Sequence, residues 1–328
     1  MRVLNLLFLV GILLGLVSGP GTLNAQDLGA LTSSCISRMP TALNPLCHSA
    51  IFAARSVRSI MSVADGMGSE TAGSSSIIGR RKVGALGSRN YSASLSSGMV
   101  WSHLPSLNTT NVDQGLPNGF NVYNVKATFT AGLFEGLTIS PGWGGILGLD
   151  LVGSGSLQVL TWDSELQART ARIGSYGVRL GLLRESFSTP GITLSVVRQY
   201  ETAQELEAKQ PEYTDLFVKS KATRLRAVVG KELGDFGVLA GVGWNRNSGL
   251  LQGTIPGMLL RIAHSFSSET VKESQTLYFS SVSYTNMVFQ ISLELGLAEG
   301  LNDSSLRYVK YEPVAYIPFS RIAFRARV

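Results

Sequence analysis

Residues 124–133 read NVKATFTAGL, and apolar side chains alternate there with polar or small ones without interruption. The apolar set is Val125, Ala127, Phe129, Ala131 and Leu133. Successive side chains of a β-strand point to opposite faces, so this period of two predicts a strand with one apolar and one polar face. The segment is the clearest example of a pattern that fills most of the chain.

The same alternation recurs in residues 91–96, 176–182, 224–229, 238–244, 289–297 and 321–328. Together with weaker segments it predicts about ten strands. They are expected near residues 83–101, 121–134, 137–152, 172–185, 191–201, 220–232, 236–246, 275–285, 287–298 and 314–328. Period two alone does not decide whether the apolar faces point outward to lipid or inward to the core of an exported soluble β-protein.

The predicted connections alternate in length. Short turns are expected near residues 135–136, 188–190, 234–235 and 285–286, and long polar connections at 102–120, 153–171, 202–219, 247–274 and 299–313. Transmembrane barrels have short turns on one side and long loops on the other, and usually an even strand count. The alternation therefore favours the lipid-facing interpretation, with both barrel termini on the short-turn side.

The N-terminus has the layout of a secretory signal peptide. Arg2 precedes an apolar run at residues 3–17, and SGPG at 18–21 interrupts it before Ala25. The run is shorter than the ~20 residues that a membrane-spanning helix needs. We therefore expect residues 1–25 to be a cleaved signal peptide and the mature chain to be exported.

Residues 26–80 form a separate N-terminal segment. In an exported chain, Cys35 and Cys47 are expected to form a structural disulfide. Apolar residues at helical spacing predict a helix over 46–64, followed by a Gly- and Ser-rich linker at 65–80. This helix could plug a barrel, but Arg55 and Arg58 would add positive charge to a basic lumen, so we expect it outside, on the periplasmic side.

The signal peptide, the amphipathic strands and the terminal strand SRIAFRARV (residues 320–328) resemble a Gram-negative outer-membrane β-barrel protein of the porin-like kind. The resemblance covers about residues 81–328. It implies an all-β, up-and-down antiparallel barrel of about ten strands, or twelve if 65–80 or 256–266 also pair, in contact with outer-membrane lipid and inserted by the assembly machinery. The chain ends on Val328, where this class usually ends on Phe or Trp.

The polar strand faces carry the functional prediction. If they enclose the lumen, nine charged residues line it: Lys126, Asp150, Arg179, Arg224, Arg226, Glu294, Arg321, Arg325 and Arg327. The basic ones prevail, as in the whole chain, which has 28 Lys and Arg against 22 Asp and Glu. A narrow basic lumen attracts anions. The prediction is passage of small anionic solutes; the alternatives are a hydrophobic-compound channel with an N-terminal plug and a non-conducting structural or adhesin barrel.

Other functional classes have little support in the sequence. Three His and two Cys leave few ligands for a metal site. His103, Asp113 and His264 fall in expected long loops, but nothing positions them as an acid–base pair, so we expect no enzyme and no cofactor. Basic residues are spread along the strands without interleaved aromatics, which argues against nucleic-acid binding. The sequence does not indicate an oligomeric state.

Overall fold

The computed structural model describes residues 25–37, 41, 44–67, 91–107, 117–138, 144–162, 169–186, 189–207, 214–255, 264–268, 272–286, 289–301 and 314–327. Residues 1–24 lie outside these ranges, so the signal peptide stays a prediction. Within the described part of the chain, the helices are too short or too polar to span a bilayer.

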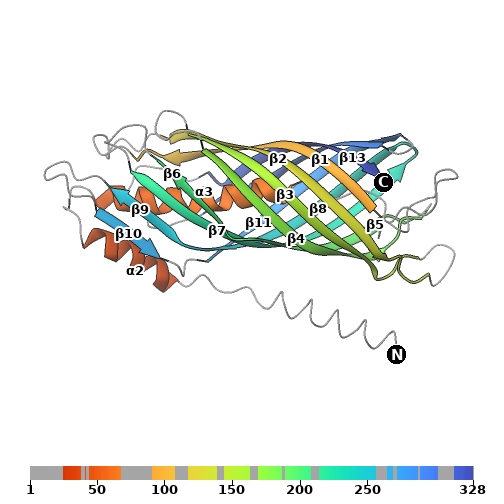
Figure 1. Cartoon of the computed structure of the whole chain (residues 1–328), viewed down its shortest axis with the longest axis horizontal. Coiled ribbons are helices and arrows are strands. Elements are labelled where there is room, and N and C mark those ends of the chain that lie inside the picture. The colour runs from red at the N-terminus through yellow and green to blue at the C-terminus, as the bar shows by residue number, and fades with distance from the viewer. Residues whose placement is uncertain are drawn as a thin grey trace, which may run out of the picture.

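Ten antiparallel strands form a closed barrel (Figure 1). Its wall follows the order β1-β2-β3-β4-β5-β7-β8-β11-β12-β13, and pairing of β1 with β13 closes the ring. The bounds are β1 Tyr91–Pro105, β2 Pro117–Phe134, β3 Gly148–Trp162, β4 Arg169–Leu183, β5 Gly191–Gln199, β7 Asp215–Leu233, β8 Phe236–Ser248, β11 Glu273–Asn286, β12 Phe289–Glu299 and β13 Tyr316–Arg327. Closure pairs every wall strand on both sides, as a chain in lipid requires.

Three short strands extend the wall at the long-loop end. They are β6 Thr202–Leu206, β9 Leu251–Ile255 and β10 His264–Ser268. Strands β6 and β9 both pair with the outer part of β7, and β10 pairs with β9. Residues 202–219 and 247–274 were expected to be loops, but they contain these three short strands and the first residues of β7.

The apolar strand faces point outward. Val125, Phe129, Leu133, Leu293 and Phe324 all remain about half exposed, whereas Lys126, Thr128 and Glu294, which point the other way, are buried. Water-exposed rows of this kind would be costly, but lipid solvates them. The lipid-facing interpretation is therefore confirmed.

The largest boundary error concerns β3. It was expected at residues 137–152, but it runs from Gly148 to Trp162, and only the isolated bridge between Leu137 and Ile146 precedes it. The connection after β2 therefore spans residues 135–147, and the short turn expected near 135–136 is wrong. Gly153 and Gly155 made the following stretch look like a loop. Both lie inside the strand, where a Cβ would meet nothing within 4 Å, so small residues are tolerated rather than required.

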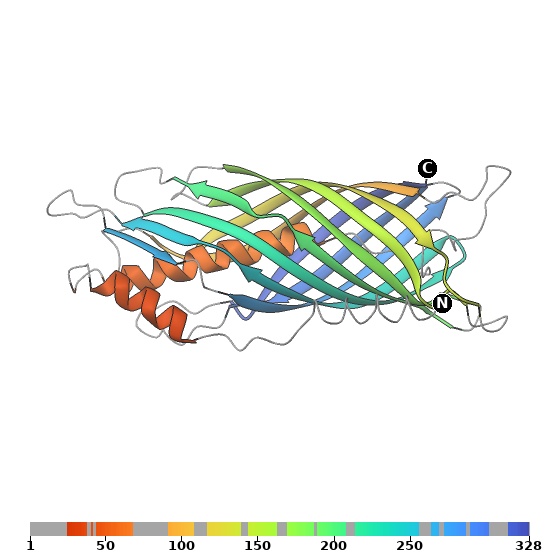
Figure 2. The ribbon, with the colours of Figure 1, turned by 60° about the horizontal axis from the view of Figure 1, so that its bottom comes forward.

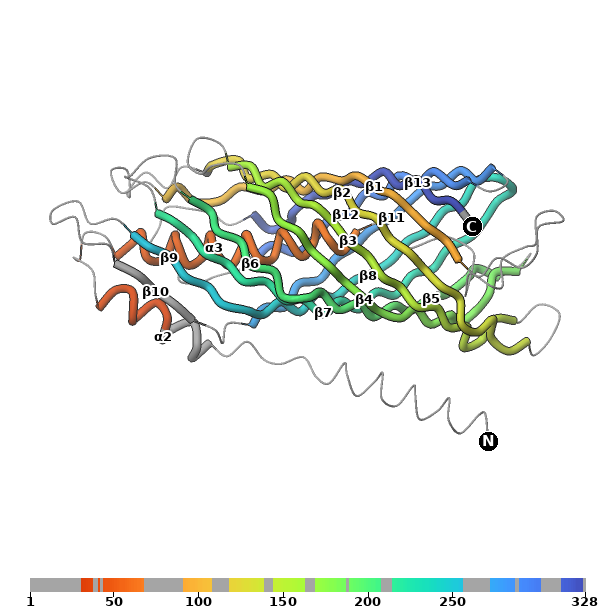
Figure 3. Tube along the Cα trace, viewed as in Figure 1, coloured from red at the N-terminus to blue at the C-terminus, as the bar shows by residue number. Residues whose placement is uncertain are grey.

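Two helices precede the barrel. Helix α2 (Ala25–Ile36) was not predicted; helix α3 (Asn44–Gly66) agrees closely with the expected helix. Helix α3 runs inside the barrel, from the long-loop end to about the middle (Figures 1 and 2), and nearly all its residues are buried. Helix α2 lies at the long-loop end (Figure 3) and contacts β10. The expectation that α3 lies outside the lumen is therefore wrong.

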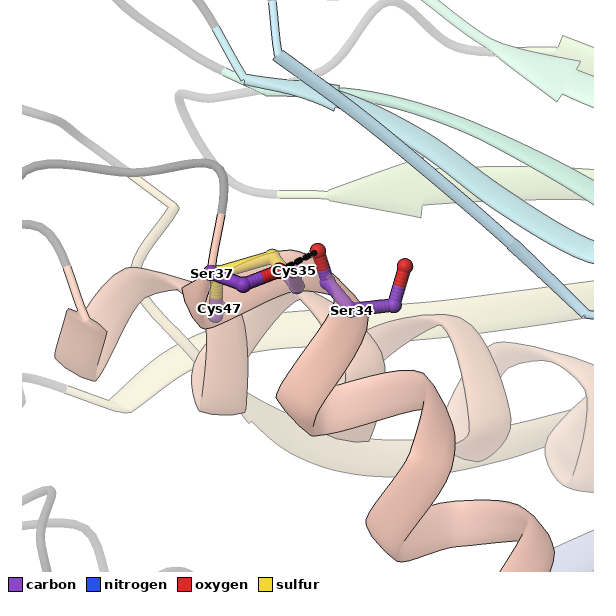
Figure 4. The surroundings of a disulfide bond; sticks show 4 residues. All are labelled: Ser34, Cys35, Ser37 and Cys47. Carbon is purple, nitrogen blue, oxygen red and sulfur yellow. Dashed lines mark hydrogen bonds between the residues drawn. A yellow bond between two sulfur atoms is a disulfide. The ribbon is translucent and has the colours of Figure 1, made fainter.

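The predicted disulfide between Cys35 and Cys47 is present. It joins the last turn of α2 to the first turn of α3 (Figure 4). Beside it, the Ser37 hydroxyl donates a hydrogen bond to the carbonyl of Ser34, at 3.2 Å, where α2 ends. The bridge therefore holds the two helices together at the mouth of the barrel.

Candidate functional site

The lumen has two zones along its axis. Toward the long-loop end, the inward positions of the strands are apolar, including Val100, Leu104, Phe120, Val122, Leu160, Trp162, Ile173, Leu216, Val218, Ile317 and Phe319. They form one buried cluster with Ile51, Val57, Ile60 and Met61 of α3. The outer half of the lumen is therefore a hydrophobic core built around a helix, and burial of these side chains stabilises the helix in place.

Toward the middle, the same inward positions become polar and charged, and α3 ends there. Asp65, in the last turn, is 1% exposed. Its Oδ2 accepts a hydrogen bond from Arg224 Nη1 at 2.5 Å, and its Oδ1 accepts one from the Ser156 hydroxyl at 2.8 Å. Lys126 Nζ lies 3.7 Å from Oδ1. One helix carboxylate is thus held by three different strands.

The backbone carbonyls at the end of α3 are bound as well. Gln158 Nε2 donates to the carbonyl of Met61 at 2.9 Å, and Asn124 Nδ2 donates to that of Ala64 at 2.5 Å. Lys126 Nζ donates to the carbonyl of Asp65 at 2.5 Å, and Arg321 donates to that of Met67. The last carbonyls of a helix lack partners within the helix and carry partial negative charge. The basic wall therefore binds the negative end of α3.

Gly66 gives the wall arginines room to approach. A Cβ at this position would lie 2.9 Å from Arg226 Nη2 and 3.3 Å from Arg224 Cδ. Arg226 also stacks over the ring of Phe279, 5.0 Å from its centroid. We call Asp65, Lys126, Ser156, Arg224 and Arg321 the inner latch, since these residues fix the inner end of α3.

A second attachment lies nearer the mouth, at Glu273 where β11 begins. Arg55 Nε donates to Glu273 Oε1 at 2.6 Å, and Arg58 Nη2 lies 3.2 Å from Oε2. Arg58 Nη1 also donates to the carbonyl of Gly249 at 2.9 Å, and Ser59 donates to Gln275 at 2.7 Å. All three charged side chains are almost fully buried. We call Arg55, Arg58 and Glu273 the outer latch.

The outer latch explains why the expected position of α3 was wrong. Arg55 and Arg58 were expected to be repelled by a basic lumen. The wall facing them carries an acid instead, Glu273. This residue lies two residues before the predicted start of its strand at 275, so it was not counted as a lumen residue. The basic residues of the wall lie deeper, opposite the helix C-terminus.

Eight of the nine predicted lumen residues have described side chains, and all eight are buried on the inward face: Lys126, Asp150, Arg179, Arg224, Arg226, Glu294, Arg321 and Arg325. The side chain of Arg327 lies outside the described part. Arg179 Nη1 lies 3.8 Å from Asp150 Oδ2, Arg325 donates to Gln290 at 3.0 Å, and Glu294 lies opposite Arg321 in register. Sequence reasoning missed Asp65, Ser156 and Glu273, which complete the two latches.

The histidines of the expected long loops are described only in part. His103 lies near the outer end of β1 on its exposed face, Asp113 lies outside the described residues, and the side chain of His264 is not described. Among the residues that the structure describes, no three His, Cys, Asp or Glu side chains gather as metal ligands.

No model of a known protein family matches the chain, and no curated protein matches its sequence. Among solved structures, the chain is similar to the translocator domain of the autotransporter NalP from Neisseria meningitidis, at 10% identity and a TM-score of 0.40, over 84% of this chain and 95% of that one. For the transport unit of the autotransporter AIDA-I from Escherichia coli, the identity is 7% and the TM-score 0.40, over 84% of this chain and 99% of that one. For the toluene transporter TbuX from Ralstonia pickettii, the identity is 9% and the TM-score 0.34, over 82% of this chain and 97% of that one.

These similarities concern barrel architecture, and no solute or activity follows from them. The paired, closed wall and its apolar outer surface define the chain as a transmembrane β-barrel. The feature of this barrel that bears most directly on function is the helix held in its lumen.

Proposed function

We propose that the protein is a gated outer-membrane barrel that is closed to solutes while α3 is in place and passes small anions when α3 is displaced. The observation that carries the proposal is the burial of α3 in the lumen, with its inner end held by the inner latch. A closely packed helix leaves no hydrated path through the outer zone, whose wall is apolar.

The inner latch supports the choice of anions. While α3 is bound, Asp65 and the helix carbonyls neutralise Lys126, Arg224 and Arg321. When the helix end moves away, these cations lose Asp65 and the helix carbonyls and face water. A ring of cations in a narrow, low-dielectric tube favours anions and repels cations. An anion entering the lumen would also compete with Asp65 for the same side chains.

The hydrophobic-compound channel has weaker support. The outer zone is apolar, but α3 fills it, and the deeper wall is polar, with Ser94, Thr128, Ser175 and Ser281 among its inward side chains. An apolar solute would have to cross this polar zone. A plugged barrel without any transport role is the remaining alternative, and it differs from the gated barrel in conductance.

Planar-bilayer recording of the purified protein tests the proposal. The wild type should be closed most of the time, and the Asp65→Asn variant should open often, with a reversal potential in a KCl gradient that indicates chloride preference. Cation preference of the open variant would contradict the anion assignment. Absence of current in both proteins would support a non-conducting barrel instead.

A further inference from the structure

The N-terminal segment and the first barrel strand lie at opposite ends of the barrel. Helix α2, the disulfide and the start of α3 are at the long-loop end, whereas β1 begins at Tyr91, opposite Ala131 near the end of β2, at the other end of the barrel where the short β7–β8 turn lies (Figures 1 and 2). The C-terminal end of β13 is also at the short-turn end, because Arg327 pairs with Ser92. The described chain stops at Met67 in mid-lumen and resumes at Tyr91 at the short-turn end.

The side of the long loops is the external side in outer-membrane barrels, and short turns face the periplasm. An exported chain starts in the periplasm. For α2 and Cys35 to lie at the long-loop end, the segment preceding α3 must end up beyond the outer mouth. The lumen is wide enough for this passage, since it holds α3, and a helix with its side chains is about 10–12 Å across.

The charges of the wall fix this direction. In the observed orientation, Arg55 and Arg58 face the acidic Glu273 near the mouth, and Asp65 with the negative helix C-terminus faces Lys126, Arg224 and Arg321 deeper inside. A helix inserted the other way would place Asp65 and the carbonyl end near Glu273, and the two arginines near the basic wall. Every major charge contact would then be repulsive.

The disulfide adds a mechanical stop on the outer side. It ties α2 to the first turn of α3, so the structure at the mouth is two helices wide. Packed helices lie about 8–10 Å axis to axis, and a lumen filled by one helix does not admit two side by side. Retraction of the segment toward the periplasm would require reduction of the Cys35–Cys47 bond or unfolding of α2.

From this arrangement we propose that the barrel exports and displays its own N-terminal segment: α2 and the Cys35–Cys47 disulfide lie on the cell surface, and the opposed charges of the outer and inner latches select this orientation. The inference does not depend on the proposed anion passage. A barrel that never conducts can display the segment, and a conducting barrel can fail to do so.

An epitope tag tests the display, because an antibody is too large to pass through the barrel. One variant carries a short epitope after Ser37, in the α2–α3 connection; a matched control carries it in the β4–β5 connection, between Ser186 and Thr189, at the short-turn end. Antibody binding is measured on intact and on permeabilised cells, and heat-modifiable migration on gels checks that each barrel is folded. The Ser37 epitope should bind antibody on intact cells, and the control epitope only after permeabilisation.

Two outcomes would overturn the display. Either the Ser37 epitope is accessible only after permeabilisation in a folded barrel, or the control epitope is accessible on intact cells, which would reverse the orientation. Conductance of the same preparations is recorded separately, so failure of anion passage is distinguishable from failure of display.

Charge reversal tests the selection of direction. Glu273→Arg places a third cation beside Arg55 and Arg58, and we expect the fraction of folded protein with a surface-accessible Ser37 epitope to fall at least several-fold. Adding Arg55→Glu and Arg58→Glu restores opposite charges and should restore display. If display is the same in all three proteins, the latches do not select the orientation.

Discussion

Neutralising Asp65 should release the inner end of α3. In the Asp65→Asn variant, the side chain keeps its size and can still accept a hydrogen bond from Ser156, but its charge contacts with Arg224 at 2.5 Å and Lys126 at 3.7 Å are lost. The side chains of both cations are at most 3% exposed, so each is left as a buried charge without its carboxylate. Removing one partner of a buried ion pair typically costs about 3–5 kcal/mol.

That cost converts into a large change of population. At about 1.4 kcal/mol per factor of ten, a loss of about 3 kcal/mol raises the ratio of displaced to bound helix more than 100-fold. The lower end of the range applies, because the carbonyl contacts of α3 and the apolar packing of Ile60 and Met61 remain. We expect single-channel recordings of Asp65→Asn to show an open probability higher by about two orders of magnitude, until it saturates.

The control for this variant is Asp235→Asn, which neutralises an exposed aspartate in the short β7–β8 turn and should leave gating unchanged. A double variant, Asp65→Asn with Lys126→Gln, removes one of the unpaired cations and should recover part of the closed state. The reasoning is refuted if Asp65→Asn opens no more often than the wild type while the same preparation conducts after denaturant has displaced α3.

Three further predictions concern other parts of the molecule. Glu273→Gln removes the carboxylate of the outer latch, so hydrogen exchange should accelerate most in the outer half of α3, and least near Gly66. Gly66→Val brings a side chain against the Arg226 guanidinium, so bilayer recordings should show more frequent opening than in the wild type. Leu293→Arg places a cation on the lipid face and should cost about 2–4 kcal/mol in folding titrations into vesicles, whereas Leu233→Arg, beside a turn, should cost about 1 kcal/mol or less.

Most of the barrel was predictable because lipid and lumen impose opposite preferences on alternate residues. This rule located most strands, the face that meets lipid and the inward position of residues such as Arg224 and Arg321. It failed at β3, where Gly153 and Gly155 are small on a face expected to be apolar and large. The short extensions β6 and β9 were also missed, because their residues lie beyond the lipid-facing rows of the wall strands.

The position of α3 was not predictable from net charge alone, since it depends on where along the axis each charge lies. One signal in the sequence points to it. Inward positions near the long-loop end are apolar, such as Val100, Phe120 and Leu160, although the same face is polar in mid-strand. An apolar inner surface needs an apolar partner, and the apolar face of residues 46–64 provides it. A comparison of the inward residues by their position along the barrel axis would have indicated a plug.

The presence of α3 in the lumen of the folded, membrane-embedded protein is the central claim, and a thiol cross-link tests it most directly. Ser59 and Gln275 are in hydrogen-bond contact, so Ser59→Cys with Gln275→Cys should be joined by a short bismaleimide in high yield in isolated outer membranes. The control variant carries Ser59→Cys with Gln290→Cys, which lies at the other end of the lumen, and its two cysteines should not be cross-linked. Efficient joining of the first pair alone is the predicted result. Equal or no joining of the two pairs in a folded barrel would contradict the account.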